Sequence, residues 1–162
     1  MFATPLLRLA EVILADARSR KLKIATAESC TGGLVSAILT EIPGSSDVFE
    51  RGFVTYSGQA KRDLLGVPGD LIADYGEVSE PVVRAMAEGA LNYSKADVSV
   101  AVTGVAGPGG GTPLKPVGHV HFAAARRGRN IIHELHRFGD LGRAEVRLKS
   151  VETALELLRR QL

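Results

Sequence analysis

Residues 23–33 read KIATAESCTGG, and the way this segment divides into elements determines the fold class. Lys23–Ala27 alternates polar and apolar residues, which is typical of a strand. Ser29–Gly33 is a turn of small residues, and Leu34–Thr40 has the pattern of a helix. The segment therefore predicts a strand, a turn and a helix, with Ser29 on the turn.

The rest of the chain continues this alternation of strands and helices. Further strands are expected at residues 52–56 and 98–103, and a hairpin from the runs 117–125 and 131–138. Thr4 before Pro5 indicates the start of a first helix that runs to about residue 20. Other helices are expected at 59–65, 70–75, from Ser79 onward, and at 144–158.

This order predicts an α/β fold, a three-layer α/β/α sandwich with a mixed sheet: a parallel part plus a C-terminal antiparallel hairpin. A chain of 162 residues without a linker or repeat suits one domain spanning 1–162. Ligands of such sheets bind beyond the carboxyl ends of the strands. The turn at Ser29, the segment after Tyr56 and the loop after Thr103 are therefore expected to meet at one cleft.

Composition excludes several classes of protein. The 20 Lys and Arg residues nearly balance the 18 Asp and Glu residues, so no strong positive field is available for binding nucleic acid. Cys30 is the only cysteine, which rules out an intramolecular disulfide. Arg8 and Glu11 interrupt the apolar N-terminal segment, so neither a signal peptide nor a membrane span is indicated. We expect a cytoplasmic protein that does not bind membranes.

Ser29 and Cys30 are adjacent candidate nucleophiles before a helix, where free backbone N–H groups can stabilise an oxyanion. The simpler alternative is that Ser29 or Thr31 only caps the helix. Cys30 could react as a thiolate or could be a small buried apolar residue. A cysteine hydrolase would also need a histidine base, and the first histidine in the chain is His119.

Lys61 is the leading candidate for the base that a serine nucleophile needs. It follows the strand that is expected to end at Tyr56, where partial burial and a neighbouring cation such as Arg62 would lower the lysine pKa. The alternative is an ordinary solvated lysine on a helix. Tyr56 could relay a proton or could simply pack with its hydroxyl in water.

The glycine-rich loop that begins at Gly104 matches neither the P-loop nor the dinucleotide motif, although glycine-rich backbone can bind anions. His119 and His121 share one face of a strand, but no third ligand accompanies them, so no metal is expected. Arg143 and Arg147 lie one turn apart at the start of the last helix. Both could be exposed, or they could hold a phosphate.

Seven short motifs, taken in their order along the chain, resemble those of a known protein family. They are TAESCTGG at 26–33, GSS at 44–46, FVTYS at 53–57, AK at 60–61, VSEPVV at 78–83, TGVAGPGGG at 103–111 and KPVG at 115–118. Together they resemble the C-terminal domain of the competence/damage-inducible CinA family, over nearly the whole chain. His119 departs from the pattern, because many relatives have a small hydroxyl residue there.

The resemblance implies a nicotinamide-nucleotide amidase, which hydrolyses the carboxamide of nicotinamide mononucleotide to nicotinic acid mononucleotide and ammonia in pyridine nucleotide recycling. It implies no metal, no organic cofactor and a homodimer. It also implies a Ser29–Lys61 dyad supported by Tyr56 and Thr103. It further implies that the loop from Gly104 to Gly110 forms part of the substrate pocket. Our expected substrate-binding residues are Gly104, Ala106, Gly107 and Gly110 of this loop, together with Glu28, Cys30, Thr31, Gly32 and Arg143.

Longer relatives carry an additional N-terminal domain with nucleotide pyrophosphatase activity. This chain starts at the first helix of the amidase domain, so that second activity is expected to be absent. Two alternatives to the amidase remain open at this point. One is a non-catalytic regulatory or binding module of the competence/damage-inducible kind, and the other is an amidase for a different carboxamide.

Overall fold

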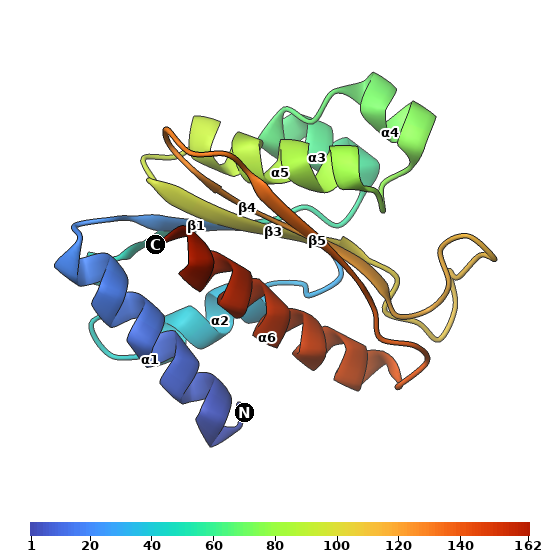
Figure 1. The fold of residues 1–162 in the computed structure, drawn as a ribbon. Coiled ribbons are helices and arrows are strands. Elements are labelled where there is room, and N and C mark those ends of the chain that lie inside the picture. The colour runs from blue at the N-terminus through green and yellow to red at the C-terminus, as the bar shows by residue number, and fades with distance from the viewer.

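The computed structural model describes residues 1–162, and its centre is a five-stranded sheet in the order β2-β1-β3-β4-β5 (Figure 1). The central strand β3 pairs parallel to β1 and antiparallel to β4, so the sheet is mixed as predicted. The other two pairs are β1 with β2, which is parallel, and β4 with β5, which is antiparallel. The strands are β1 (Ile24–Glu28), β2 (Phe49–Val54), β3 (Val98–Gly104), β4 (His119–Arg126) and β5 (Ile132–Arg137).

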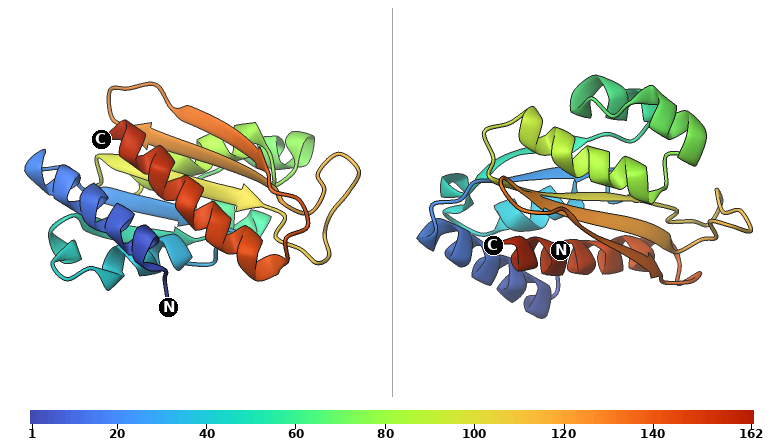
Figure 2. Two further views of the ribbon diagram at one scale, coloured as in Figure 1. Left: turned by 60° about the horizontal axis from the view of Figure 1, so that its bottom comes forward. Right: turned by 45° about the horizontal axis from the view of Figure 1, so that its top comes forward.

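Helices cover both faces of the sheet and complete the predicted three layers. One side carries α1 (Thr4–Ser19), α2 (Leu34–Glu41) and α6 (Arg143–Gln161). The other carries α3 (Gly58–Leu65), α4 (Gly69–Tyr75) and α5 (Glu80–Asn92). Figure 2 shows the same separation from two further directions, with the segment between β3 and β4 projecting beyond the sheet. The predicted α/β sandwich is confirmed.

The two apolar clusters that hold the layers together differ in side-chain size. Valine and leucine side chains dominate the cluster under α1, α2 and α6, whereas the sheet presents mostly alanine to α5. Small side chains let α5 approach the sheet closely, and Ser99 Oγ donates a hydrogen bond to the Ala87 carbonyl in that contact. Gly89 of α5 extends the close packing to α3, because a Cβ there would collide with the carbonyl oxygen of Leu65. This contact fixes the helix that carries Lys61.

The second strand differs from the sequence prediction. It was expected at residues 52–56, and it spans Phe49–Val54 after a short 3₁₀ turn at Ser45–Asp47. As the edge strand of the sheet, β2 has solvent along one side, and its first half includes the adjacent ion pair of Glu50 and Arg51. A charged edge segment lacks the apolar pattern by which strands are recognised.

The three parallel strands all end at one edge of the sheet. Glu28, the last residue of β1, pairs with Val54 of β2 and Val102 of β3. Backbone hydrogen bonds continue past the strand ends, from Ser29 N–H to Val102 O at 3.0 Å and from Thr55 N–H to Glu28 O at 2.8 Å. The backbone of the Ser29 turn is therefore held on both sides.

Candidate active site

The Ser29 side chain is in direct contact with Lys61, although 32 positions separate them in the chain. Lys61 Nζ lies 3.0 Å from Ser29 Oγ and donates a second hydrogen bond to the Thr55 carbonyl at 2.9 Å. Lys61 is fully buried, and Ser29 is 7% exposed. The lysine comes from α3, which follows β2, and the serine follows β1, so both derive from the edge where the parallel strands end.

The environment of Lys61 favours its neutral form. No carboxylate makes an ion pair with the Lys61 ammonium. Burial lowers the pKa of Lys61, and the negative charge of Glu77 partly opposes this effect. The suggestion that Arg62 also lowers this pKa is wrong, because Arg62 is exposed to solvent, which screens its charge, and burial alone lowers the pKa.

Cys30 lies next to the serine but is a poor nucleophile in this structure. Its side chain is 5% exposed, and burial raises the pKa of the thiol to about 12. A cysteine attacks as the thiolate, which is scarcely populated near neutral pH when the pKa is so high. Of the two adjacent candidates, the geometry favours Ser29.

A cavity of about 190 Å³ opens above the serine. Tyr56 is 60% exposed, and its hydroxyl accepts a hydrogen bond from Arg143 Nη2 at 3.0 Å. Arg143 Nη1 also donates to the Gly107 carbonyl at 2.8 Å. Ser29 thus lies at the floor and Tyr56 with Arg143 at the solvent side. The lining residues are Ser29, Cys30, Tyr56, Glu77, Val78, Thr103, Gly104, Ala106 and Arg143.

Glu77 and Val78 belong to this cavity although the sequence did not single them out. The Glu77 carboxylate accepts a hydrogen bond from Gly58 N–H at the start of α3, at 2.9 Å. The backbone carbonyl of Glu77 accepts one from the Thr103 hydroxyl, also at 2.9 Å. Glu77 does not follow a strand, whereas the site residues were expected at the ends of strands. Its place just before the helix opened by Ser79 was the only available signal.

Glu28, named as a pocket residue, instead caps the helix behind the nucleophile. Its two carboxylate oxygens accept hydrogen bonds from Val35 N–H, Ser36 N–H and Ser36 Oγ at 2.8, 3.0 and 2.8 Å. A carboxylate at a helix N-terminus is stabilised by the free N–H groups there. The other residues named for the pocket that do not line the cavity are Thr31, Gly32, Gly107 and Gly110.

This cap changes where oxyanion donors can come from. The N–H groups of the helix itself were the expected donors, but those of Val35 and Ser36 are bound to Glu28, and that of Leu34 to the Thr31 carbonyl. In the turn, the N–H groups of Cys30 and Thr31 donate to no backbone carbonyl. The free donors nearest the nucleophile are therefore turn amides.

The Arg147 side chain binds the carbonyl groups of this turn. It is neither a freely exposed arginine nor part of an open phosphate site. Its Nε donates to the Cys30 carbonyl at 3.1 Å and its Nη2 to the Thr31 carbonyl at 3.3 Å. In a planar trans peptide the carbonyl and the following N–H point in opposite directions. By binding the Cys30 carbonyl, Arg147 therefore fixes the direction of the Thr31 N–H.

Three histidines form a hydrogen-bonded chain on the side of the sheet that α5 covers. His119 Nε2 lies 3.1 Å from His121 Nε2, and His121 Nδ1 lies 2.9 Å from His133 Nε2. His133 Nδ1 then faces Glu80 Oε1 at 3.4 Å. Burial and the neighbouring imidazoles lower the pKa of His121 to about 4. No group of three or more His, Cys, Asp or Glu side chains is arranged around a metal position.

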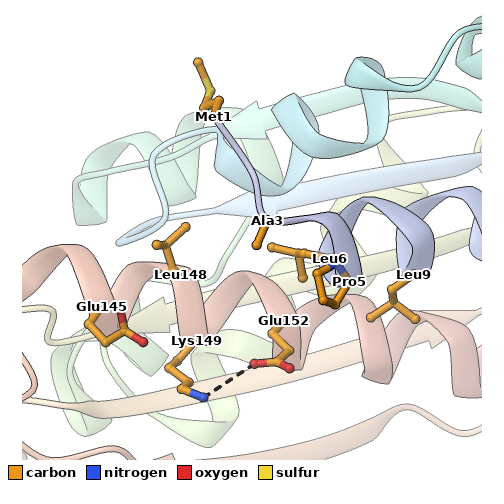
Figure 3. Close-up of a pocket in the computed structure, with 9 residues that line it drawn as sticks. All are labelled: Met1, Ala3, Pro5, Leu6, Leu9, Glu145, Leu148, Lys149 and Glu152. Atoms are coloured by element: carbon orange, nitrogen blue, oxygen red, sulfur yellow. Dashed lines mark ion pairs between the residues drawn. The ribbon is translucent and has the colours of Figure 1, made fainter.

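A larger hollow of about 400 Å³ lies between α1 and α6 (Figure 3). Apolar side chains such as Leu6, Leu9 and Leu148 line it, together with the Lys149–Glu152 ion pair of α6. It shares no residue with the cavity above Ser29 and contains no candidate nucleophile. We therefore place the candidate active site in the smaller cavity.

Fold and site together define the class: an α/β/α protein whose mixed sheet carries a buried serine–lysine pair where its parallel strands end. The chain belongs to the CinA C-terminal domain family, whose model matches residues 6–162. None of the helices is both long enough and apolar enough to span a bilayer.

Solved structures and curated relatives agree with this assignment. The competence/damage inducible protein CihA from Agrobacterium tumefaciens is 50% identical, with a TM-score of 0.98 over 99% of this chain and 98% of that one. A CinA superfamily protein from Escherichia coli is 33% identical, with a TM-score of 0.92 over 100% and 94% of the two chains.

Among curated sequences, a CinA-like protein from Akkermansia muciniphila is 58% identical over 120 residues, which are 74% of this chain and 29% of that protein. A putative competence-damage inducible protein from Symbiobacterium thermophilum is 64% identical over 110 residues, 68% of this chain and 26% of that protein. The matched region spans about a third or less of these relatives.

Proposed function

We propose that this protein is an amidase that hydrolyses the carboxamide of nicotinamide mononucleotide to nicotinic acid mononucleotide and ammonia. The observation that carries the proposal is the 3.0 Å contact between Ser29 Oγ and the Nζ of a buried, unpaired lysine. A serine hydroxyl is a weak nucleophile until a base accepts its proton, and a desolvated lysine is one of the bases that can do so.

Acylation begins when the hydroxyl of Ser29 gives its proton to neutral Lys61 as Oγ bonds to the carboxamide carbon. Neutral lysine has one lone pair, so it accepts from Ser29 while still donating to the Thr55 carbonyl. The Lys61 ammonium then gives that proton to the amide nitrogen. The carbon–nitrogen bond breaks, ammonia leaves, and an ester to Ser29 remains.

Deacylation repeats these transfers with water. Lys61 takes a proton from water as the water oxygen bonds to the ester carbon, and it returns the proton to Ser29 Oγ as the ester bond breaks. The free N–H groups of Cys30 and Thr31 are the proposed donors to the negatively charged oxygen in both steps, with Arg147 fixing the peptide that joins them. The cycle consumes water and releases carboxylate and ammonium.

The size of the cavity matches a small reacting group at its floor. Pockets for drug-sized ligands are usually about 300–1,000 Å³, and this cavity measures about 190 Å³. It has room for a carboxamide and its ring, whereas a ribose phosphate would extend towards solvent. We assign phosphate binding to Arg143, which lies at the solvent side with Tyr56.

The direct test is the release of ammonia from nicotinamide mononucleotide by the purified protein. We expect the two products in equal amounts in wild type and neither with Ser29→Ala, which removes only the hydroxyl. A panel of other carboxamides identifies the substrate if the mononucleotide is not cleaved. Inactivity on every amide would contradict the proposal.

A further inference from the structure

Two opposite charges line the cavity above Ser29, and neither is neutralised by an ion pair. Glu77 and Arg143 both belong to its wall and are both exposed. They make no salt bridge with each other or with any other residue. A small cavity with a free carboxylate and a free guanidinium is suited to a ligand that carries both charges.

Glu77 is also fixed in place, which a specificity residue requires. One carboxylate oxygen is bound to Gly58 N–H, and the backbone carbonyl of the same residue is bound to the Thr103 hydroxyl. Gly58 starts the helix that carries Lys61, and the charge of Glu77 acts on that lysine. The carboxylate therefore lies on the side of the reacting atoms.

Arg143 occupies a different part of the wall. Its guanidinium is held by the Tyr56 hydroxyl and the Gly107 carbonyl, two neutral acceptors that leave its charge uncompensated. Because Tyr56 is 60% exposed, this contact lies towards solvent rather than at the buried floor. A ligand would thus have its positive part near Glu77 and its negative part near Arg143.

We propose that Glu77 is a specificity-determining residue that selects carboxamides carried on a positively charged ring, while Arg143 takes the anionic group of the same substrate. This inference rests on the proposed amidase function and adds the residue that distinguishes a carboxamide on a cationic ring from one on a neutral ring. A pyridinium ring with a phosphate tail is of the first kind. A neutral ring with the same tail gains nothing from Glu77.

The test compares two substrates that differ only in ring charge: nicotinamide mononucleotide, whose ring is cationic, and its 1,4-dihydro form, whose ring is neutral. The variant is Glu77→Gln, which removes the charge and keeps an oxygen that can accept from Gly58 N–H. We expect kcat/KM for the cationic substrate, divided by that for the neutral one, to fall roughly fivefold, as for a partly exposed charge pair. Added salt should shrink the difference.

Using the ratio removes other effects of the variant. Any change in the pKa of Lys61 or in the position of α3 alters both rates alike and cancels. The matched control is Glu88→Gln, which makes the same change of net charge on an exposed part of α5 and should leave the ratio unchanged. Equal losses on both substrates with Glu77→Gln would overturn the inference and assign Glu77 an architectural role only.

Arg143 is tested with a second pair, the mononucleotide and its riboside, which keeps the cationic ring and lacks the phosphate. Arg143→Gln should reduce kcat/KM for the mononucleotide roughly tenfold and change that for the riboside little. Equal losses on both would remove Arg143 from phosphate binding. If wild type cleaves neither the mononucleotide nor its riboside, the proposed function fails, and this outcome is separate from any change in a ratio.

Discussion

The Nζ atom of Lys61 lies 3.0 Å from Oγ of Ser29, and no carboxylate neutralises that lysine. A buried ammonium without a counter-ion is destabilised relative to the neutral amine. The fold thus keeps a proton acceptor beside a hydroxyl. An apolar side chain could fill the space of Lys61 equally well. We therefore test the pair through its chemistry.

The first prediction separates the two adjacent nucleophile candidates. Ser29→Ala should lower kcat for ammonia release by about 10³-fold or more, because the attacking oxygen is lost. Cys30→Ala should retain most of the activity, since the thiol is protonated near neutral pH. Thermal unfolding of both variants shows whether they are folded. An active Ser29→Ala protein together with an inactive but folded Cys30→Ala protein would identify a cysteine amidase instead.

How far the sequence leads can be judged from Ser29 and Lys61. Ser29 could be located directly, because a strand followed by small residues and a helix defines its turn. Lys61 could be named as a candidate base because it follows a strand end, but an ordinary solvated lysine remained an alternative there. The family resemblance decided between the two, since no local pattern reports a contact across 32 positions. The order of the layers could also be predicted from the sequence, because strands and helices alternate along the chain. The predicted bounds of the charged edge strand β2 differ from the observed ones by up to three residues.

Two site details could not be predicted, for reasons of side-chain direction. Glu28 ends a strand next to the nucleophile, and strand periodicity alone cannot show that its carboxylate turns back to cap α2. Glu77 lies in a loop between two helices and enters the cavity through the packing of α5 against the sheet. Both positions depend on tertiary contacts that sequence periodicity does not encode.

The second prediction concerns protonation of the base. A general base must be neutral, so kcat/KM should rise with pH through the lowered pKa of Lys61. Lys61→Arg keeps the positive charge but cannot lose its proton at any working pH. It should therefore lose activity by orders of magnitude, about as much as Lys61→Ala, and still bind the mononucleotide in calorimetry. Retention of most of the rate would leave Lys61 with charge stabilisation only, and Tyr56 would be tested next.

The third prediction uses Glu77 to move that pH profile. The negative charge of Glu77 favours the ammonium form and so raises the pKa of Lys61 against the larger effect of burial. Glu77→Gln removes this contribution, and the rising limb of kcat/KM should move to lower pH. The measurement is the full pH–rate profile for one substrate. A limb that stays in place would mean that another group titrates there.

The fourth prediction concerns metals. His119 and His121 are bound to each other and to His133, and no set of three or more ligating side chains surrounds a common point. Dialysis against a chelator should leave the rate of ammonia release unchanged, and added Zn²⁺ or Mn²⁺ should not increase it. Loss of activity in chelator that a specific metal restores would contradict the serine–lysine mechanism.

The fifth prediction is that the histidine chain makes the fold sensitive to mild acid. Protonation of His121 would place a positive charge on a buried imidazole that is flanked by two others, and burial and these neighbours both oppose that charge. The pKa of His121 is about 4 in the folded protein, against an ordinary value of 6.5. Between these two values the unfolded chain binds the proton and the folded chain does not, so the free energy of unfolding decreases as pH falls.

The window between about pH 6.5 and 4.5 isolates this effect, because carboxylates with lowered pKa values, such as Glu134, lose their stabilisation below it. Urea unfolding at several pH values should give a steep slope for wild type. His121→Gln should reduce that slope by about 1.4 kcal/mol per pH unit, the contribution of one proton. The control is His136→Gln, which removes an imidazole that does not belong to the hydrogen-bonded chain of histidines. This variant should keep the wild-type slope. Comparing slopes separates the effect of titration from any loss of stability that is the same at every pH. An unchanged slope in His121→Gln would show that the three histidines do not control acid unfolding.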